Sequence, residues 1–205
     1  VPPRLVADGW RVAIADIAPA AADRTSGELG TAAMALKLDV RSESEWAAAV
    51  ARLDETWGGV DLLVNSAGIA TSGTVERSPI EQWSWVLDIN LLGTVRGCRA
   101  VIPGMRARGT GHLANVASFA GIANAPSMAS YNAAKAAVIS LSETLRHELH
   151  ADGIGVSVAC PAFIKTPLME SSRKLAPAET GSLLPDPRME AIVRHLMETS
   201  GVTAE

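Results

Sequence analysis

The sequence predicts an α/β protein in which a doubly wound parallel sheet of the Rossmann type lies between layers of helices, a three-layer αβα arrangement. Short apolar runs alternate with longer helical patterns along the chain, which is typical of β-α units. Runs such as Val60–Asn65 are apolar at nearly every position, which indicates strands buried on both faces. With 205 residues, 48% of them hydrophobic, the chain is large enough for one substantial core, so a single domain over residues 1–205 is expected.

The first half of the chain contains clear local signals. Ser42 followed by Glu45 three residues later is a helix-start pattern, and this helix is expected to end at Gly58. The run from Arg11 is rich in β-branched residues, which favours a strand. The predicted elements are strands over Arg11–Ile17, Ala33–Val40 and Val60–Asn65 and helices over Pro19–Leu29 and Ser42–Trp57.

The second half continues the alternation. The predicted elements are a long helical segment over Pro79–Arg108, a strand over His112–Ser118, a helix over Ser130–His150 and a strand over Ile154–Cys160. Residues 167–190 differ, because they contain four prolines among scattered Ser, Glu and Lys. Two interpretations stay open for this stretch, a mobile segment over a site and a disordered loop.

Composition and charge argue against several classes of function. The net charge is −4 and the sequence has no basic run, which argues against a nucleic-acid-binding surface. No stretch approaches the roughly twenty apolar residues of a membrane-spanning helix, and no signal peptide opens the chain. A soluble cytoplasmic protein is therefore expected. The 4 histidines and 2 cysteines show no metal-ligand spacing, so no metal site is expected.

Tyr131 and Lys135 form the most informative pair of the sequence. They stand four residues apart in a predicted helix, so they project from the same helical face. A phenol with a pKa near ~10 is a poor acid-base group at neutral pH, and a neighbouring ammonium lowers that pKa and makes proton exchange with an alcohol or carbonyl feasible. The spacing alone is equally compatible with a surface Tyr and Lys that share no function.

These two residues belong to an ordered series of motifs. The series is Asp16 at the end of one strand, Asp39-Val40 at the end of another, Asn65-Ser-Ala-Gly68, Asn90, Ser118, Tyr131-Asn-Ala-Ala-Lys135 and Pro161-Ala-Phe-Ile-Lys-Thr166. From about Arg11 onward, the motifs and their order resemble those of the short-chain dehydrogenase/reductases, enzymes that pass hydride between a nicotinamide cofactor and an alcohol or carbonyl. The resemblance implies an oxidoreductase that acts on an alcohol or ketone. Apolar residues such as Ala125, Pro126 and Phe163 favour a small, largely apolar substrate; an equal alternative is that they pack in the core or in a lid.

The resemblance assigns catalytic roles to Asn90, Ser118, Tyr131 and Lys135. Tyr131 is expected to be the general acid-base, and Ser118 is expected to hold the substrate oxygen. Lys135 is expected to lower the pKa of Tyr131 and to bind the nicotinamide ribose. Asn90 resembles the residue that positions a water molecule for proton relay; alternatively, it only caps or bends its own helix.

The resemblance also implies an NAD site, whose residues are Asp16, Asp39, Val40, Asn65, Ala67, Gly68, Tyr131, Lys135, Pro161, Ile164 and Thr166. Asp16 is expected to accept hydrogen bonds from the adenosine ribose and to repel a 2′-phosphate, which favours NAD over NADP. Alternatively, Asp16 is a turn residue that caps the next helix. Asp39 and Val40 are expected to bracket the adenine. Ala162 stands where the family has glycine, which is costly if the backbone there requires positive φ.

Both ends of the sequence depart from the family's pattern. The glycine-rich turn that holds the cofactor pyrophosphate in the family does not precede Arg11, and the family's last strand is missing. Val1–Gly9 looks like the end of the helix that follows this turn, although Pro2 and Pro3 fit poorly inside a helix. The chain is therefore expected to be an internal fragment or a product truncated at both ends.

Two alternatives to a dehydrogenase stay open. The first is a non-catalytic or cofactor-binding-defective truncated member of the same fold, and the second is a dehydratase or epimerase that uses the same Tyr and Lys. As partner, the resemblance implies a second copy of the chain, in a homodimer or homotetramer built on helices Pro79–Arg108 and Ser130–His150. The small residues of the second helix would otherwise pack against the protein's own sheet.

Overall fold

The computed structural model describes residues 2–162, 164, 168–180 and 195. These residues fall into two compact units, one within Val1–Gly59 and one within Val60–Ala204, and each is described by itself. The expectation of a single domain that lacks the family's first and last strands stays a prediction. Within the described residues, no helix combines the length and the apolar character that crossing a lipid bilayer requires.

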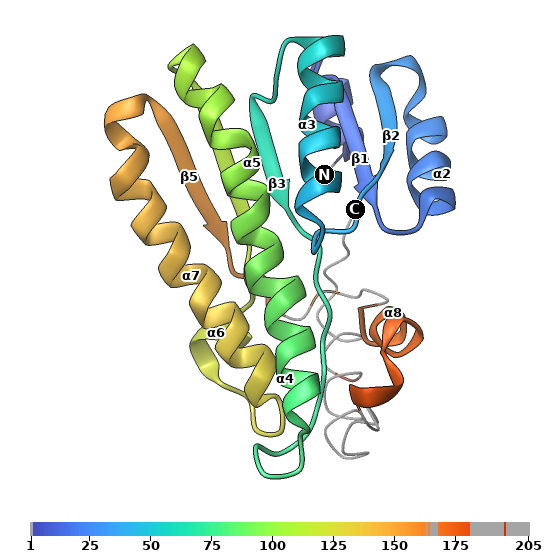
Figure 1. Cartoon of the computed structure of the whole chain (residues 1–205), viewed down its shortest axis with the longest axis vertical. Coiled ribbons are helices and arrows are strands. Elements are labelled where there is room, and N and C mark those ends of the chain that lie inside the picture. The colour runs from blue at the N-terminus through green and yellow to red at the C-terminus, as the bar shows by residue number, and fades with distance from the viewer. Residues whose placement is uncertain (1, 163, 165–167, 181–194, 196–205) are drawn as a thin grey trace. The chain divides into compact units, whose positions relative to one another are not determined.

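The N-terminal unit is built on two parallel strands (Figure 1). Its described elements are α1 (Pro2–Ala7), β1 (Val12–Asp16), α2 (Pro19–Leu29), a 3₁₀ turn (Gly30–Ala32), β2 (Ala33–Lys37) and α3 (Glu43–Trp57). The two strands pair in register from Val12 with Ala33 to Asp16 with Lys37. α2 packs on both strands. The predicted order of elements is confirmed, and β2 ends before the Val40 limit that the apolar pattern predicted.

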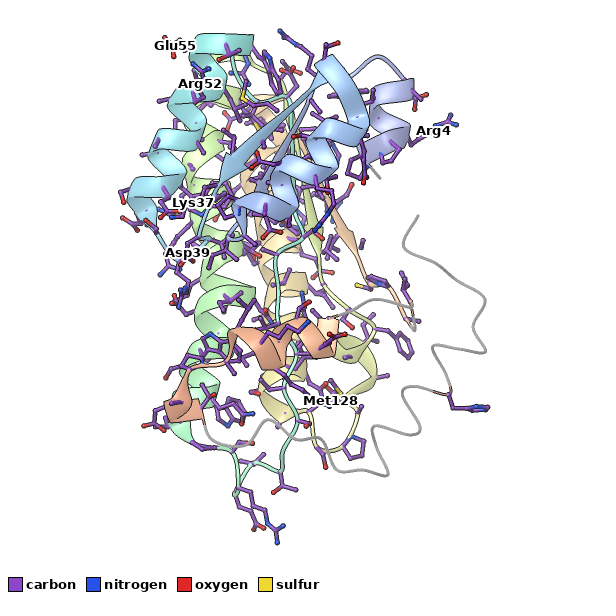
Figure 2. All side chains as sticks on the ribbon, turned by 90° about the vertical axis from the view of Figure 1, so that its right-hand side faces the viewer. Arg4, Lys37, Asp39, Arg52, Glu55 and Met128 are labelled. Atoms are coloured by element: carbon purple, nitrogen blue, oxygen red, sulfur yellow. The ribbon has the colours of Figure 1, made fainter. Side chains whose placement is uncertain are left out.

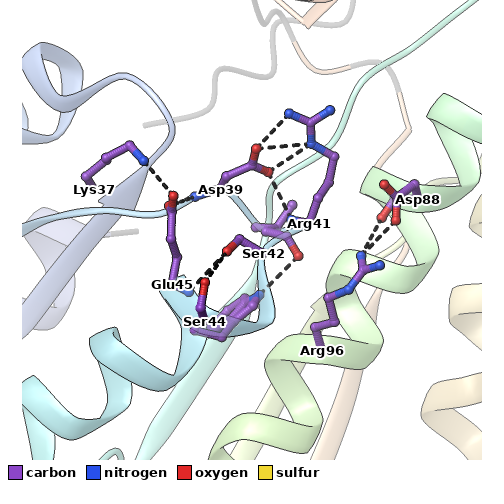
Figure 3. Close-up of polar contacts among 10 residues, drawn as sticks. Lys37, Asp39, Arg41, Ser42, Ser44, Glu45, Asp88 and Arg96 are labelled. Carbon is purple, nitrogen blue, oxygen red and sulfur yellow. Dashed lines mark hydrogen bonds and ion pairs between the residues drawn. The ribbon is translucent and has the colours of Figure 1, made fainter.

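The start and the end of α3 follow the predicted signals. The Ser42 side chain accepts a hydrogen bond from the backbone N–H of Glu45 (3.2 Å), and Gly58 ends the helix in the left-handed conformation with φ 83°. The Glu45 carboxylate accepts hydrogen bonds from the Asp39 backbone N–H (2.7 Å) and from the Lys37 Nζ (2.6 Å), as Figure 3 shows. Glu45 therefore ties α3 to the end of β2.

α1 accommodates the two prolines that looked unfavourable in the sequence. Pro2 and Pro3 stand in the first turn of the helix, where a backbone N–H has no intrahelical acceptor and proline is tolerated. Arg4 of α1 pairs with Asp8 at 3.0 Å, and on α3 Arg52 pairs with Glu55 at 3.4 Å (Figure 2). Both ion pairs are largely exposed to solvent, so they contribute little to stability.

The second unit is built on three parallel strands in the order β3-β4-β5, counted over its described residues (Figure 1). Asn65 of β3 lies level with Asn115 of β4. α5 packs on β3 and β4, while α7 packs on β4 and β5. The described elements are β3 (Leu62–Asn65), α4 (Ile80–Leu87), a π-helical turn (Asp88–Leu92), α5 (Gly93–Arg108), β4 (Gly111–Val116), α6 (Ala120–Ala123), α7 (Ala129–Leu149), a 3₁₀ turn (His150–Asp152), β5 (Ile154–Ala159), α8 (Leu168–Leu175) and a second 3₁₀ turn (Ala178–Thr180). Parallel strands flanked by helices confirm the predicted α/β class.

The long helical segment predicted over Pro79–Arg108 is confirmed, with one addition. The π-helical turn Asp88–Leu92 interrupts the regular α-helix between α4 and α5, and π turns inside helices occur frequently at functional sites. Asp88 and Arg96 pair at 2.8 Å across this turn, and the pair is drawn in Figure 3. The turn carries Asn90, a candidate site residue.

A chain of buried polar side chains links the strand ends to α7. The Asn65 Nδ2 donates to the Asn115 Oδ1 (2.9 Å), and the Asn115 Nδ2 donates to the Ser142 Oγ (3.0 Å). The Ser142 hydroxyl in turn donates to the carbonyl oxygen of Val138 (2.7 Å). Each group has a partner, so the network can be buried without an unpaired polar group. The same unit contains fully buried apolar side chains, which include Val86, Val138, Met105 and Leu113.

Residues 167–190, which were interpreted as a mobile segment over a site or as a disordered loop, include the helix α8, which neither interpretation predicted. In α8, the Ser172 hydroxyl donates to the Leu168 carbonyl (2.6 Å) and accepts from the backbone N–H of Ala70 (2.9 Å). Beyond the helix, Ala176 packs against a buried cluster of Ile69, Trp85, Val86 and Ala134. Contacts with distant parts of the chain stabilise this helix, and local composition does not report such contacts. Residue 167 and residues 181–190 of the same range lie outside the described residues.

Close packing of α6 on α7 yields a stability prediction. A Cβ on Gly121 would lie 2.7 Å from the backbone carbon of Lys135 and 2.8 Å from the backbone nitrogen of Ala136. We therefore expect Gly121→Ala to lower the free energy of unfolding by about 1–3 kcal/mol in urea titrations. The control is Gly27→Ala in α2, where a Cβ meets nothing within 4 Å and where alanine should stabilise the helix by roughly 0.5–1 kcal/mol. Equal stability of Gly121→Ala and the unsubstituted protein would contradict this packing.

Candidate active site

The site begins with the loop after β3, which Asn90 holds in place. The Asn90 Nδ2 donates to the carbonyl oxygen of Ile69, and the Asn90 Oδ1 accepts from the N–H of Ile69, both at 2.8 Å. Only 1% of Asn90 is exposed. The Thr94 hydroxyl donates to the Asn90 backbone carbonyl at 3.0 Å. The Asn90 side chain therefore fixes another segment of the chain and does not cap its own helix.

Gly68 brings the backbone of this loop close to two predicted site residues. A Cβ on Gly68 would lie 3.2 Å from the Asn90 Oδ1 and 3.6 Å from the Lys135 Nζ. The first of these distances is tighter than ordinary van der Waals contact, so a larger residue would require its neighbours to shift. The absence of a side chain thus lets the loop, the π-helical turn and α7 meet at one place.

Lys135 is a buried ammonium on α7. Its Nζ donates a hydrogen bond to the carbonyl oxygen of Val116 at the end of β4 (2.8 Å). Burial lowers the pKa of Lys135 to about 8, because removal from water disfavours the charged form. An ammonium carries three N–H donors. Within the described part of the chain, Lys135 uses one of them, in its hydrogen bond to Val116.

Tyr131 lies in the first turn of α7 and is also buried. Burial raises the pKa of its phenol, and a hydrogen bond with the Ser118 side chain offsets part of that rise. The predicted lowering of this pKa by Lys135 is therefore wrong for this structure. The Lys135 Nζ lies 5.8 Å from the centre of the Tyr131 ring and donates to Val116, and the Ser118 side chain, not Lys135, is the group that lowers the pKa of Tyr131 against burial.

Ser118 follows β4 and starts the turn into α6. Its Oγ accepts from the backbone N–H of Ala120 (3.1 Å). The next residue, Phe119, donates its N–H to the carbonyl oxygen of Pro161 (2.9 Å), which places the segment after β5 beside this turn. Ser118 can therefore serve both the turn and the Tyr131 hydroxyl.

The segment from Pro161 is described in part. Ile164 donates its N–H to the carbonyl of Ala162 at 3.2 Å, and Thr166 lies outside the described residues. Among the described non-glycine residues, positive φ is confined to Asn124 and Ser127. Ala162 consequently carries no strain of this kind, and its place in the family's glycine position has no such cost here.

The N-terminal unit holds the three residues predicted at the adenosine end. The Asp16 Oδ1 accepts from the Ala18 N–H (2.8 Å), as expected for a turn residue, while its Oδ2 makes no hydrogen bond within the described residues. Arg41 binds both carboxylate oxygens of Asp39, with a shortest distance of 2.7 Å (Figure 3). These hydrogen bonds lower the pKa of Asp39, against the opposing effect of burial. Val40 accepts from the Trp46 indole N–H at 3.1 Å.

The structure therefore assembles one set of the predicted residues in its second unit. Gly68, Asn90, Ser118, Tyr131 and Lys135 are joined by direct contacts or by short distances. The Asn65 amide is engaged in the buried network with Asn115, and Ala67 is exposed. The cofactor roles predicted for Asn65, Ala67, Pro161 and Ile164 stay predictions.

Sequence reasoning missed three residues that support this set. Thr71 and Ser130 share a hydrogen bond of 3.0 Å between their hydroxyls, and Ser172 holds the N–H of Ala70. Thr71 and Ser130 are 59 positions apart in the sequence. Serine and threonine at such separations carry no pattern, so no signal in one sequence could have identified them.

Comparison with known proteins identifies the family. The model of the short chain dehydrogenase family matches residues 2–176. The chain belongs to this family. Its members are dehydrogenases, which fits the assembled tyrosine, lysine and serine.

Two curated relatives and one solved structure illustrate the likeness. The chain is 37% identical over 183 residues, 89% of its length and 76% of the relative's, to the inactive 2-(S)-hydroxypropyl-CoM dehydrogenase 2 of Xanthobacter autotrophicus. It is 36% identical over 166 residues, 81% of its length and 64% of the relative's, to a 3-alpha-(or 20-beta)-hydroxysteroid dehydrogenase of Mycobacterium bovis. A short chain dehydrogenase/reductase from Burkholderia phymatum, solved in complex with NAD, is 32% identical with a TM-score of 0.86 over 98% of this chain and 76% of that chain. The chain thus spans between 64% and 76% of the length of these proteins.

The pKa of Lys135 leads to a prediction for stability against pH. The ordinary pKa is 10.5 and the folded value is about 8, so between these values the unfolded chain binds more protons and the free energy of unfolding rises with pH. We expect this rise to exceed that of Lys135→Met by on the order of 2 kcal/mol between about pH 7.5 and about pH 9.5. Chemical denaturation of both proteins at several pH values measures the difference. Burial raises the pKa values of Tyr131 and Cys98, so these two groups lower the free energy of unfolding as the pH rises. They are present in both proteins, so their effects cancel in the comparison. Parallel pH profiles would contradict a buried Lys135 ammonium.

Proposed function

We propose that the chain is the catalytic part of a nicotinamide-dependent dehydrogenase or reductase, with Tyr131 as general acid-base. One observation carries the proposal: Tyr131, Ser118 and Lys135 lie together beside the Asn90-held loop. The family has the same reaction class. The substrate would be a small, largely apolar alcohol or ketone; the names of the two curated relatives share with it only a hydroxyl group.

Tyr131 would exchange a proton with the substrate oxygen. Because burial raises its pKa, the phenol is protonated at neutral pH and suited to donate a proton to a carbonyl oxygen. Ser118, whose side chain lowers the pKa of Tyr131, would bind the same oxygen through its hydroxyl. In alcohol oxidation the proton moves in the reverse direction, onto a Tyr131 phenolate, and the Ser118 side chain, which lowers the pKa of the phenol, would stabilise that phenolate.

The residues present fit a nicotinamide cofactor. Lys135 is a buried ammonium that makes one described hydrogen bond, so it retains donors for the hydroxyls of a ribose. Gly68 leaves the backbone bare beside the Lys135 Nζ. Bound NAD or NADP would supply the hydride acceptor or donor for the reaction. Asn90 would act by holding the loop of Gly68, and the relay role expected for it stays a prediction.

NAD is the cofactor that we propose over NADP. Asp16 stands exposed at the end of β1, and its Oδ2 makes no hydrogen bond within the described residues. A carboxylate there would repel the 2′-phosphate that distinguishes NADP from NAD. The solved relative from Burkholderia phymatum contains NAD. Asp16 also accepts the Ala18 N–H, so its turn role and its proposed cofactor role use different oxygens.

A non-catalytic member of the family is the second candidate. One of the relatives is named as inactive, and that name describes the relative alone. Against this candidate, Tyr131, Ser118 and Lys135 are all present and in contact or near contact. The cytoplasmic location expected from the sequence stays a prediction.

The first test of the function is Tyr131→Phe. The ring and its packing survive, while the exchangeable proton is lost, so we expect kcat to fall by about 10²–10⁴-fold with cofactor affinity nearly unchanged. Tyr131 is the single tyrosine of the chain, so no neighbouring phenol can substitute. Steady-state kinetics and fluorescence titration with NADH measure the two quantities. A kcat close to that of the unsubstituted protein would refute the role of Tyr131.

The second test concerns cofactor choice. Asp16→Ala should weaken NADH binding and narrow the preference for NADH over NADPH, because both the ribose hydrogen bonds and the repulsion of a phosphate are removed. Calorimetric dissociation constants for the two cofactors give the ratio. The control is Asp23→Ala in α2, an exposed carboxylate away from the strand end. If the ratio is the same for Asp16→Ala and the unsubstituted protein, Asp16 is a turn residue alone.

The third test concerns self-association. We propose a homodimer or homotetramer in which α4–α5 and α7 pair with their copies, as in the family. α7 has small residues such as Ala133 and Ala136 on its surface, and Leu92 beside α5 is 43% exposed. Light scattering at micromolar concentration should give a dimeric or larger mass, and Leu92→Glu should shift it toward the monomer. A monomeric mass for the unsubstituted protein would rule the interface out.

A further inference from the structure

We infer that Thr71 is a positioning residue for Tyr131 and that it acts through the hydroxyl of Ser130. Thr71 lies in the loop after β3, and Ser130 immediately precedes Tyr131 in α7. The inference rests on the proposed function of Tyr131. The hydrogen bond between these two hydroxyls, which are distant in sequence, would hold the Tyr131 phenol in place.

The contact between the two hydroxyls is short and buried. The Thr71 Oγ1 and the Ser130 Oγ lie 3.0 Å apart, and the residues are 1% and 4% exposed. No water competes for a hydrogen bond at such burial, and loss of either hydroxyl leaves the other without this partner. The pair therefore joins the loop to the first turn of α7.

The first turn of α7 needs an external anchor. Met128, its N-terminal flanking residue (Figure 2), provides no side-chain cap, and uncapped helix ends fray. Ser127 in the preceding segment has a φ of 59°, a left-handed conformation that is unfavourable for serine, whereas asparagine tolerates the positive φ found at Asn124. Contacts from elsewhere must hold this segment, and the backbone N–H of Gly73 donates to the Ser127 carbonyl at 2.8 Å.

The loop that carries Thr71 is itself firmly anchored. Asn90 holds Ile69, Ser172 holds Ala70, and the Gln82 Nε2 reaches the Ser72 carbonyl at 3.4 Å. Three separate helical elements thus support the residues on both sides of Thr71. A group on such a rigid support can fix a partner, whereas a mobile one cannot.

Two unpaired polar atoms belong to residues that are close in sequence to this pair. Among the described buried side chains, the polar atoms without a partner are the Ser72 Oγ and the Asn132 Oδ1. Ser72 is adjacent to Thr71 in sequence, and Asn132 is two residues after Ser130. Buried unpaired groups cost stability, and proteins tolerate such a cost chiefly where function constrains the packing.

The consequence for catalysis follows from geometry. Tyr131 belongs to the first turn of α7, so a displacement of that turn moves the phenol relative to Ser118. Misplacement of a reacting group by about 1 Å can cost about 10²-fold in rate. Without the hydroxyl pair, the turn would loosen and water would reach the phenol.

The test uses Thr71→Val and Ser130→Ala, singly and together, with two readouts. We expect kcat to fall by about tenfold or more in each single variant and no further in the double variant, because both changes remove the same hydrogen bond. Thr71→Ser, which keeps a hydroxyl, should restore most of kcat.

The second readout is ultraviolet titration of the phenol, which reports on Tyr131 alone because the chain has a single tyrosine. Because water would reach the phenol, the pKa of Tyr131 should fall toward its ordinary value of 10.0. The variants leave the residues Lys135 and Ser118 in place, so a change in the titration does not come from their loss.

The matched control is Ser142→Ala, which removes a buried hydroxyl from the same helix, roughly 16 Å from Tyr131 along the axis. It should lower stability without changing kcat or the Tyr131 titration. The inference is wrong if Thr71→Val behaves like this control, or if the two single losses multiply in the double variant. The titration needs no turnover, so it decides the inference even if the unsubstituted protein proves inactive, an outcome that would refute the proposed function alone.

Discussion

The pair of hydrogen bonds between the Asn90 side chain and the backbone of Ile69 is the interaction on which the site depends. Both bonds are 2.8 Å long, and the amide is almost completely buried. Loss of this side chain would leave the N–H and the carbonyl of Ile69 buried and unpaired, at a cost of about 1–3 kcal/mol each. Because Gly68 and Thr71 lie on either side of Ile69, the bare backbone beside Lys135 and the anchor of Tyr131 both follow from this one contact. The π-helical turn supplies the local geometry in which Asn90 projects toward another segment.

Burial governs the chemistry of the site more than charge does. Tyr131 and Lys135 are both removed from water, and burial moves their pKa values in opposite directions, upward for the phenol and to about 8 for the ammonium. Each shift disfavours the charged form. The phenol therefore keeps its proton at neutral pH, and the ammonium begins to lose its own a little above neutrality. This arrangement suits proton donation to a carbonyl. Alcohol oxidation requires that the phenolate be stabilised, and the Ser118 side chain supplies part of that stabilisation.

Much of this account was predictable from the sequence, because strong local signals are independent of tertiary context. Ser42 and Gly58 marked the ends of α3, and the apolar run before Asn65 marked β3. Tyr131 and Lys135 were found by helical spacing and by an ordered set of motifs. The rest depends on long-range contacts: α8 forms where Ser172 reaches Ala70, and the pKa of Tyr131 rises because its phenol is buried in the folded chain. Neither contact leaves a mark on the local pattern of residues.

The central claim is that this chain transfers hydride between a carbinol carbon and a nicotinamide, and isotope transfer tests it most directly. Secondary alcohols that carry deuterium at the carbinol carbon would be incubated with the protein and NAD, and the NADH formed would be analysed by mass spectrometry. The account predicts that for at least one small apolar alcohol the NADH is heavier by the mass of one deuterium in place of hydrogen. NADH binding without deuterium transfer from any alcohol of the set would contradict it and would favour a non-catalytic member of the family.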